Sequence, residues 1–373
     1  MKRLLSIVLC VVAALSISAR VTEQVLYYTS TDQHGDTLTL SGKVSVPEHP
    51  KGIILMPHYT IASNNEVPST STTPEANYLR DDYVLVMPDY IGYGASISRI
   101  HPYLRGDVTA RNCVDMLFAS WPVMDSLGVT LPKDSIYLVG FSQGGATVLW
   151  TLKLLEEQYA DRVFVKHCYA GGGPYDVAAT YDDAVQRNHV GMAMVIPMLV
   201  MGTSEAYDLN LSRELFFTPE MDKHYDEYIT DKRLSFAVLY FLMFDSKVDK
   251  WLSRYGMDKS QPETRRMYEG FLRSSLVHYP IDNSAVGQDV ICPGTGYMPT
   301  NMVGTWLPKA PVYVFHSYND RIVSFINAEH LQRCWQGLDN VTFEFGDFGS
   351  HGWSMMSFFP RVQKQLKQQS SKP

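Results

Sequence analysis

Ten consecutive residues decide how this chain folds: Ile136-Tyr137-Leu138-Val139-Gly140-Phe141-Ser142-Gln143-Gly144-Gly145. An apolar, strand-like run leads into a Gly-x-Ser-x-Gly turn, and the helical run Thr147–Leu155 follows. Small residues beside Ser142 let the backbone turn sharply, so the serine hydroxyl projects from the turn. The short pattern alone is weak evidence, and a glycine-rich turn with an incidental serine is the alternative. The strand, turn and helix around it favour a nucleophilic serine.

A nucleophilic serine needs a base to take its proton and a third group to hold that base in one tautomer. Two later strands lead to such residues. Asp320 follows the apolar run Pro311–Phe315, and His351 follows Val341–Phe345. We therefore predict Ser142 as nucleophile, Asp320 as acid and His351 as base, in that chain order.

Three other residues compete for these roles. His316 ends a predicted strand, but it lies so close to Asp320 that we interpret it as a structural hydrogen-bonding residue. Asp347 precedes His351 too closely to reach the far ring nitrogen. Asp176 follows the strand before the long interval described below, and it is the reserve acid.

An acyl-transfer site also needs two backbone N–H groups for the negative charge that develops on the attacked carbonyl oxygen. The residue after the nucleophile, Gln143, supplies one. The other is expected from the loop Met56–Thr60, where Thr60 is the first choice and Tyr59 the second. His58 in that loop is predicted to pack there and hold the loop in place.

Apolar runs and helical patterns alternate along the chain, which indicates an α/β fold with a mostly parallel sheet covered by helices on both faces. The expected strands are Gly52–Met56, Tyr83–Met87, Ile136–Val139, Val163–Tyr169, Pro311–Phe315 and Val341–Phe345. The expected helices are Asp107–Ala119, Gly144–Gln158 and Phe325–Leu338. The segments Gln24–Ser30 and Leu38–Pro47 predict an antiparallel hairpin at the sheet edge. Residues from Gln363 to Pro373 look like a polar tail.

The interval between the strands that end at Tyr169 and begin at Pro311 is far longer than a crossover needs. Helical patterns fill it over Pro219–Tyr228, Asp231–Tyr255 and Pro262–Tyr279, and Thr218 is placed to cap the first. We predict a helical cap (lid) over residues 175–305, inserted into a catalytic domain made of residues 20–174 and 306–373. Its apolar stretches, His189–Gly202 and Leu234–Phe244, suit packing inside the cap better than an acyl or aromatic-acid pocket, though both remain open.

The N-terminus has the order of a signal peptide. Lys2 and Arg3 precede an apolar run that begins at Leu4, and small residues follow as far as Ala19. The run is short for a membrane-spanning helix. We therefore expect residues 1–19 to be removed and the protein to be exported, either to a periplasm or to the outside, without a stable membrane anchor.

Composition excludes several classes of protein. The chain has 373 residues, is 45% hydrophobic and 19% charged, and carries a net charge of −7, which excludes intrinsic disorder and argues against nucleic-acid binding. Cysteines 113, 168, 292 and 334 permit two disulfides or four isolated thiols. No Cys-x-x-Cys or His-x-x-x-His spacing indicates a metal site, and we expect no cofactor.

These motifs resemble those of the α/β-hydrolase superfamily: the turn at Ser142, the loop Pro88–Ser96 after the next strand, and the Asp320 and His351 loops. Trp306-Leu307-Pro308 and Val67-Pro68-Ser69 further resemble secreted lipases and esterases with a large helical lid. One departure is His58-Tyr59, where many relatives have His-Gly, and it puts the identity of the oxyanion donor in that loop in doubt.

The resemblance implies an exported serine hydrolase that cleaves a carboxylic ester of a small molecule, a lipid or an acylated sugar. A serine peptidase of the aminopeptidase or prolyl-peptidase type and a non-catalytic binding protein are the alternatives. An acyltransferase would use the same residues with another acceptor. The sequence does not name the acyl group, the alcohol or the oligomeric state.

Overall fold

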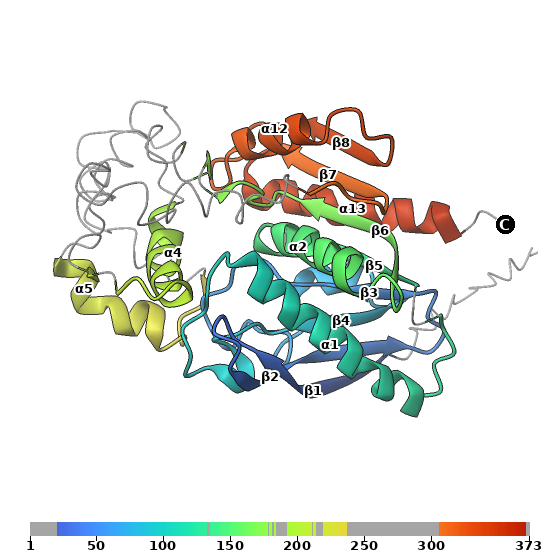
Figure 1. Ribbon diagram of the computed structural model, residues 1–373, viewed down its shortest axis with the longest axis horizontal. Helices are drawn as coiled ribbons and strands as arrows, with labels where there is room; N and C mark the ends of the chain where they lie inside the picture. Colours follow the sequence, from blue (N-terminus) through green and yellow to red (C-terminus); the bar gives the residue numbers. More distant parts are fainter. Residues whose placement is uncertain are drawn as a thin grey trace, which may run out of the picture.

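A single mixed sheet forms the centre of the molecule (Figure 1). The computed structural model describes residues 21–132, 135–177, 179–180, 183, 192–210, 212–213, 219–236 and 306–370. Within this part of the chain the sheet has eight strands in the order β1-β2-β4-β3-β5-β6-β7-β8. The strands are β1 (Val21–Thr31), β2 (Thr37–Pro47), β3 (Ile53–Leu55), β4 (Val84–Pro88), β5 (Ser135–Phe141), β6 (Phe164–Gly171), β7 (Val312–Ser317) and β8 (Val341–Gly346).

The predicted strands and edge hairpin are confirmed. Strands β1 and β2 pair antiparallel, β2 pairs antiparallel with β4, and every neighbouring pair from β4 to β8 is parallel. Parallel pairing brings the carboxyl ends of β5, β7 and β8 to one edge of the sheet. The residues that follow these three strands therefore lie near one another although they are distant in the sequence.

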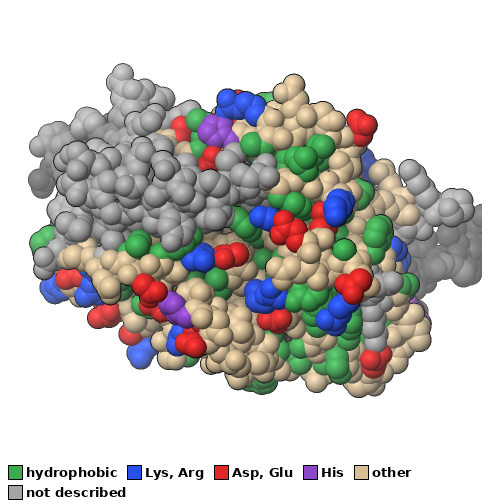
Figure 2. Space-filling view, in the orientation of Figure 1, with side chains coloured by type: hydrophobic (Ala, Val, Ile, Leu, Met, Phe, Trp, Pro, Cys, Tyr) green, Lys and Arg blue, Asp and Glu red, His purple; other side chains and the backbone are tan. Residues whose placement is uncertain are grey.

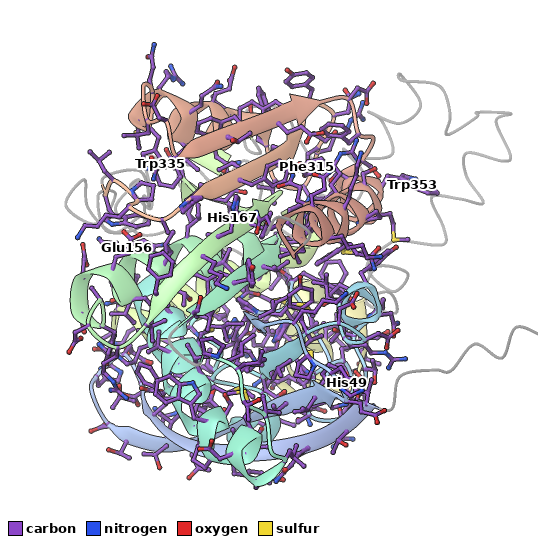
Figure 3. All side chains as sticks on the ribbon, turned by 90° about the vertical axis from the view of Figure 1, so that its right-hand side faces the viewer. His49, Glu156, His167, Phe315, Trp335 and Trp353 are labelled. Carbon is purple, nitrogen blue, oxygen red and sulfur yellow. The ribbon has the colours of Figure 1, made fainter. Side chains whose placement is uncertain are left out.

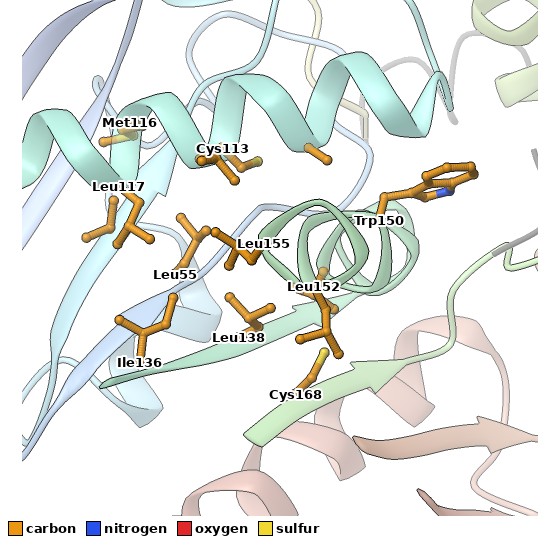
Figure 4. Close-up of a cluster of buried hydrophobic side chains, with 14 of the residues drawn as sticks. Leu55, Cys113, Met116, Leu117, Ile136, Leu138, Trp150, Leu152, Leu155 and Cys168 are labelled. Atoms are coloured by element: carbon orange, nitrogen blue, oxygen red, sulfur yellow. The ribbon is translucent and has the colours of Figure 1, made fainter. Parts of the chain in front are cut away.

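Helices cover both faces of the sheet, because side chains on each strand alternate between the two faces. In β3, Ile53 and Leu55 pack on the side of α1 (Gly106–Ser126) and α2 (Gln143–Gln158), whereas Ile54 packs on the other. Figure 4 shows the first of these cores, with leucines of both helices against β3 and β5. The helix α12 (Phe325–Cys334) also joins this side.

The opposite face is covered by η1 (Pro74–Tyr78) and by the C-terminal helix α13 (His351–Ser370). This helix differs from the predicted polar tail and from the predicted turn at His351. Its buried residues Phe358, Val362 and Leu366 recur every fourth position, as the inner face of a helix does. Pro360 lies inside the helix, the exposed Lys364 and Lys367 lie on its outer side, and Gln363 donates to the carbonyl of Tyr78.

The described part of the insertion contributes α4 (Met192–Ala206), α5 (Pro219–Tyr225) and the π-helical turn η4 (Asp226–Thr230). In Figure 1, α4 and α5 lie beyond the carboxyl ends of the parallel strands, where the cap is predicted. The predicted stretch Pro219–Tyr228 is thus helical, while residues 231–235 are not. Thr218, residues 237–255, and all of Pro262–Tyr279 lie outside the described residues.

The surface carries both signs of charge, and Figure 2 shows acidic and basic side chains interspersed over the face in view. Within the described residues, no helix is long and apolar enough to cross a membrane. Cys113 and Cys168 are buried free thiols and Cys334 is an exposed one, whereas Cys292 lies outside the described residues.

Candidate active site

Ser142 stands on the turn between β5 and α2 and has φ 57° and ψ −125°. Residues other than glycine rarely adopt a positive φ, and such strain of about 1–3 kcal/mol persists only where the surrounding structure enforces it. The turn is held by its backbone: the N–H of Ser142 donates to the carbonyl of Gly171 at 2.9 Å, and its carbonyl accepts from Gly145 at 2.9 Å. The predicted turn is therefore present, with the serine at its strained position.

Close backbone approach explains the glycines of this turn. A Cβ atom on Gly140 would lie 2.2 Å from the carbonyl oxygen of Gly144, and one on Gly144 would lie 2.3 Å from that of Pro57. Neither distance is compatible with a side chain. Gly144 thus lets the start of α2 pack directly against the loop that carries Tyr59 and Thr60.

The structure brings Ser142, Asp320 and His351 into one hydrogen-bonded chain. The Nδ1 atom of His351 lies 2.6 Å from Oδ2 of Asp320, and its Nε2 lies 2.8 Å from Oγ of Ser142. A carboxylate only accepts hydrogen bonds, so Nδ1 carries the proton and donates it to Asp320. Nε2 of the neutral ring is then free to accept from the serine hydroxyl. This is the tautomer that a general base needs.

Asp320 is buried and yet held in its ionised form. Burial alone would raise its pKa. The charge and hydrogen bond of His351, the charge of His316 and the N–H of Val323 all lower it. Together they outweigh burial, so the pKa of Asp320 lies below its ordinary value. Its second oxygen, Oδ1, accepts from the N–H groups of Ile322 and Val323 at 2.9 and 3.0 Å. These bonds fix the carboxylate as well as stabilise its charge.

The competing residues have other partners. Nε2 of His316 donates to the carbonyl of Val323 at 3.0 Å, and burial lowers the pKa of this histidine. Asp176 pairs instead with His330 of α12, at 2.9 Å. The reserve acid is therefore not part of the chain that includes His351, and His316 supports the backbone beside Asp320.

The predicted oxyanion residues lie around the serine. Tyr59 and Thr60 line the same cavity as Ser142, and Gln143 begins α2 directly after it. Within the described residues, no backbone hydrogen bond uses the N–H groups of Tyr59, Thr60 or Gln143. The N-terminal end of α2 adds the positive end of its helix dipole at this point. These N–H groups can donate hydrogen bonds to a substrate oxygen on which negative charge develops.

Tyrosine hydroxyls hold the oxyanion loop in place. Tyr90 donates to the carbonyl of His58 at 2.9 Å, and Tyr93 donates to that of Ile61 at 2.7 Å. The side-chain hydroxyl of Thr60 lies 2.7 Å from that of Tyr103. His58 itself is buried, stacks on Tyr90 with ring centroids 4.0 Å apart, and has Nδ1 2.6 Å from the carbonyl of Tyr59. It therefore packs in the loop, as predicted.

One supporting residue was not predicted from the sequence. His101 has Nδ1 2.8 Å from the carbonyl of Ile91 and Nε2 2.7 Å from the side-chain nitrogen of Gln143. Burial lowers the pKa of His101 to about 3, so the ring is neutral, donates from Nδ1 and accepts from Gln143. The only sequence signal was its place after the loop Pro88–Ser96, which is expected near the site.

A cavity of about 250 Å³ opens at Ser142 and His351. Apart from these and the oxyanion loop, its walls are mainly apolar and come from several regions of the chain, including α4 and the segment after η4. The lining residues are Tyr59, Thr60, Tyr103, Leu104, Phe141, Ser142, Pro174, Thr180, Val195, Leu199, Phe236, Ile322, Val323, His351, Gly352 and Met355. The described residues contain no group of three His, Cys, Asp or Glu side chains that could hold a metal ion.

Solved structures share this architecture. A Legionella pneumophila protein provisionally called a hydrolase superposes with a TM-score of 0.76 at 20% identity, over 96% of this chain and 91% of its own. The rice cell wall degrading esterase LipA from Xanthomonas oryzae gives 0.73 at 19% identity, over 94% and 91%. This chain has the α/β-hydrolase fold.

A more distant likeness links the fold to a lipase. Candida antarctica lipase A superposes with a TM-score of 0.61 at 15% identity, over 89% of this chain and 73% of the lipase. At such identities a structural likeness shows the fold. No protein-family model matches the sequence, and no curated protein matches it.

Proposed function

We propose that this chain is a serine hydrolase that cleaves carboxylic esters. The observation that carries the proposal is the hydrogen-bonded chain from Ser142 through His351 to Asp320, at the base of an apolar cavity. A strained serine, a neutral histidine with its acceptor nitrogen on the hydroxyl, and an ionised acid together are what acyl transfer requires.

The reaction proceeds in two halves. Ser142 Oγ attacks the ester carbonyl carbon while Nε2 of His351 takes its proton, and the imidazolium then protonates the leaving alcohol oxygen. Asp320 stabilises the charged ring and keeps it oriented. Water, deprotonated by His351, then attacks the acyl-enzyme; the bond between the acyl carbon and Ser142 Oγ breaks, the imidazolium returns the proton to Oγ, and the acid is released. In both halves, the N–H of Gln143 and that of Thr60 or Tyr59 hold the oxyanion.

The comparisons support an ester as the substrate. One protein of the same fold is named a cell wall degrading esterase and another a lipase, and we carry ester cleavage over to this chain as part of the proposal. We further propose that residues 1–19 direct export. On this proposal, residues 175–305 cap a catalytic domain of residues 20–174 and 306–373.

Replacing the nucleophile tests the proposal. We expect Ser142→Ala to lower kcat for p-nitrophenyl butyrate about 10⁴-fold or more, because the variant lacks the hydroxyl that forms the acyl-enzyme. The exposed Ser126 at the end of α1 provides the matched control, and Ser126→Ala is expected to keep the wild-type rate. Near-normal hydrolysis by the Ser142 variant would refute the assignment.

A substrate panel separates an esterase from a peptidase on the same fold. The protein is offered acyl esters and acetylated or feruloylated sugars beside aminoacyl- and prolyl-anilides. We expect the esters to be cleaved with the higher kcat/KM. Preferential cleavage of the anilides would overturn the ester assignment while leaving the serine mechanism intact.

A further inference from the structure

The cavity beside Ser142 has distinct sides for the alcohol portion and the acyl portion of an ester. His351 protonates the leaving oxygen, so the alcohol portion of an ester lies on the side of α13, where His351 and Met355 line the cavity. The carbonyl oxygen faces the oxyanion loop. The acyl group takes the remaining direction, toward the walls that come from outside α13, which include Leu104, Leu199 and Phe236.

These walls are mainly apolar, and three of the hydroxyl groups among them already make a bond within the protein. Thr60 and Tyr103 bind each other at 2.7 Å, and Thr180 donates to the carbonyl of Asp176 at 2.9 Å. A hydroxylated acyl group would lose its water and find few polar side chains here to replace it. A hydrocarbon acyl group makes no hydrogen bonds to water, so it loses none when it enters the cavity.

The volume of the cavity limits the length of the acyl group. An apolar cavity of about 150 Å³ accepts benzene, which has about six non-hydrogen atoms. In proportion, this cavity of about 250 Å³ accepts about ten non-hydrogen atoms. The ester group itself occupies about three of these positions, and the roughly seven that remain hold the acyl chain and any part of the alcohol that enters the cavity. Long fatty acyl chains exceed this.

Phe236 lines the cavity, and two charged groups, one half-buried and one buried, tie its segment to the core. The carboxylate of Glu66 accepts from the N–H of Phe236 at 3.1 Å and from those of Ala62 and Ser63 at 3.2 and 3.0 Å. Four residues earlier, the ammonium group of Lys232 donates to the carbonyls of Gly92, Ile97 and Arg99. The backbone of Phe236 is therefore held by the segment that follows the predicted oxyanion loop.

We propose that this site selects a medium-length, unsubstituted acyl group of about six to eight carbons, and that Phe236 sets the upper limit. The proposal rests on the proposed ester hydrolysis and names its acyl specificity. Glu66 acts as a positioning residue, because it fixes the backbone of Phe236 and touches no reacting atom.

The experiment measures kcat/KM for p-nitrophenyl esters of straight-chain acids from C2 to C16. For the wild-type protein we expect a rise of up to about fourfold per methylene until C6–C8, and at C16 a value at least about tenfold below the maximum. In Phe236→Ala the maximum is expected to move to about C12. The exposed Phe164 on β6 provides the matched control, and Phe164→Ala is expected to keep the wild-type profile.

Each outcome bears on one claim. Hydrolysis with a flat profile, or with a maximum at C16, overturns the acyl-length proposal and leaves the proposed function standing. An unchanged maximum in Phe236→Ala overturns the role of that residue. No hydrolysis at any length, in a protein whose Ser142 also resists fluorophosphonate labelling, refutes the proposed function itself.

Discussion

Ser142 shows how a single residue can carry both strain and function. Its backbone angles favour glycine, but a glycine would lack the nucleophile. The strain is maintained because the amide of Ser142 is bonded to Gly171 on β6 and its carbonyl to the first turn of α2. The backbone that carries the hydroxyl is therefore fixed, and Oγ lies 2.8 Å from Nε2 of His351.

The two aspartate–histidine pairs allow a direct test of which acid matters. We expect Asp320→Asn to lower kcat about 10⁴-fold, because an amide that donates to His351 Nδ1 favours the wrong tautomer. Asp176→Asn changes the matching carboxylate that pairs with His330, and its kcat is expected to stay near the wild-type value. Steady-state kinetics on a short ester distinguishes the two. A large loss in the Asp176 variant instead would identify that residue as the acid.

His101 illustrates how burial can fix a protonation state. Since its pKa lies near 3, the ring stays neutral over the range in which esterases are assayed. It thus keeps accepting from Gln143, and the side chain next to the nucleophile does not change its partner when the pH changes.

At the scale of elements, the start of α2 and the loop after β3 pack without any side chain between them. Gly144→Ala would place a methyl group 2.3 Å from the carbonyl oxygen of Pro57 and 3.0 Å from that of His58. Both contacts are backbone, so the loop itself has to move. We expect kcat to fall about 10²-fold because an oxyanion donor is displaced. Stopped-flow and steady-state kinetics check this, and an unchanged kcat would show that the donor on this loop is not needed.

Much of the sheet could be predicted because its strands are short apolar runs between turns. The helix α13 was missed, since Gly352 and Pro360 interrupt its pattern and the residues near its end are polar. Its buried stripe of Phe358, Val362 and Leu366 was readable in principle. In α13, packing of this stripe against the sheet outweighs the weak helix propensity of the local sequence.

The three residues of the hydrogen-bonded chain, Ser142, Asp320 and His351, could be predicted to lie together because each follows a strand. The residues that support them were not, because they meet through the tertiary fold: Tyr103 reaches Thr60 and His101 reaches Gln143 from one loop. The same holds for Glu66, whose partner Phe236 comes from the distant insertion. No local pattern encodes such pairs.

At the scale of the whole molecule, one buried carboxyl makes stability depend on pH. Glu75, on η1, is almost fully buried. Burial raises its pKa from 4.5 to about 7. The folded state therefore keeps this proton at pH values where the unfolded chain has lost it, and stability falls as the pH rises from about 4.5 to about 7.

We expect Glu75→Gln to remove this dependence. Above pH 8 the variant gains about 3 kcal/mol over the wild type, because no buried charge has to form, and below pH 4 the two proteins are nearly equal. Urea unfolding at several pH values measures the difference. Parallel pH curves for the two proteins would show that Glu75 is ionised in the folded state.

The position of the insertion has a consequence for how the length of this chain can change. Strands β6 and β7 are hydrogen-bonded neighbours, although the whole segment between Gly171 and Val312 separates them. The entropy lost on closing such a loop grows only with the logarithm of its length, and doubling the loop costs about 0.6 kcal/mol. The sheet can therefore keep its pairing while the segment between these two strands is lengthened, shortened or exchanged. On the proposal that residues 175–305 cap the site, substrate range can change in that segment without a new core having to be built.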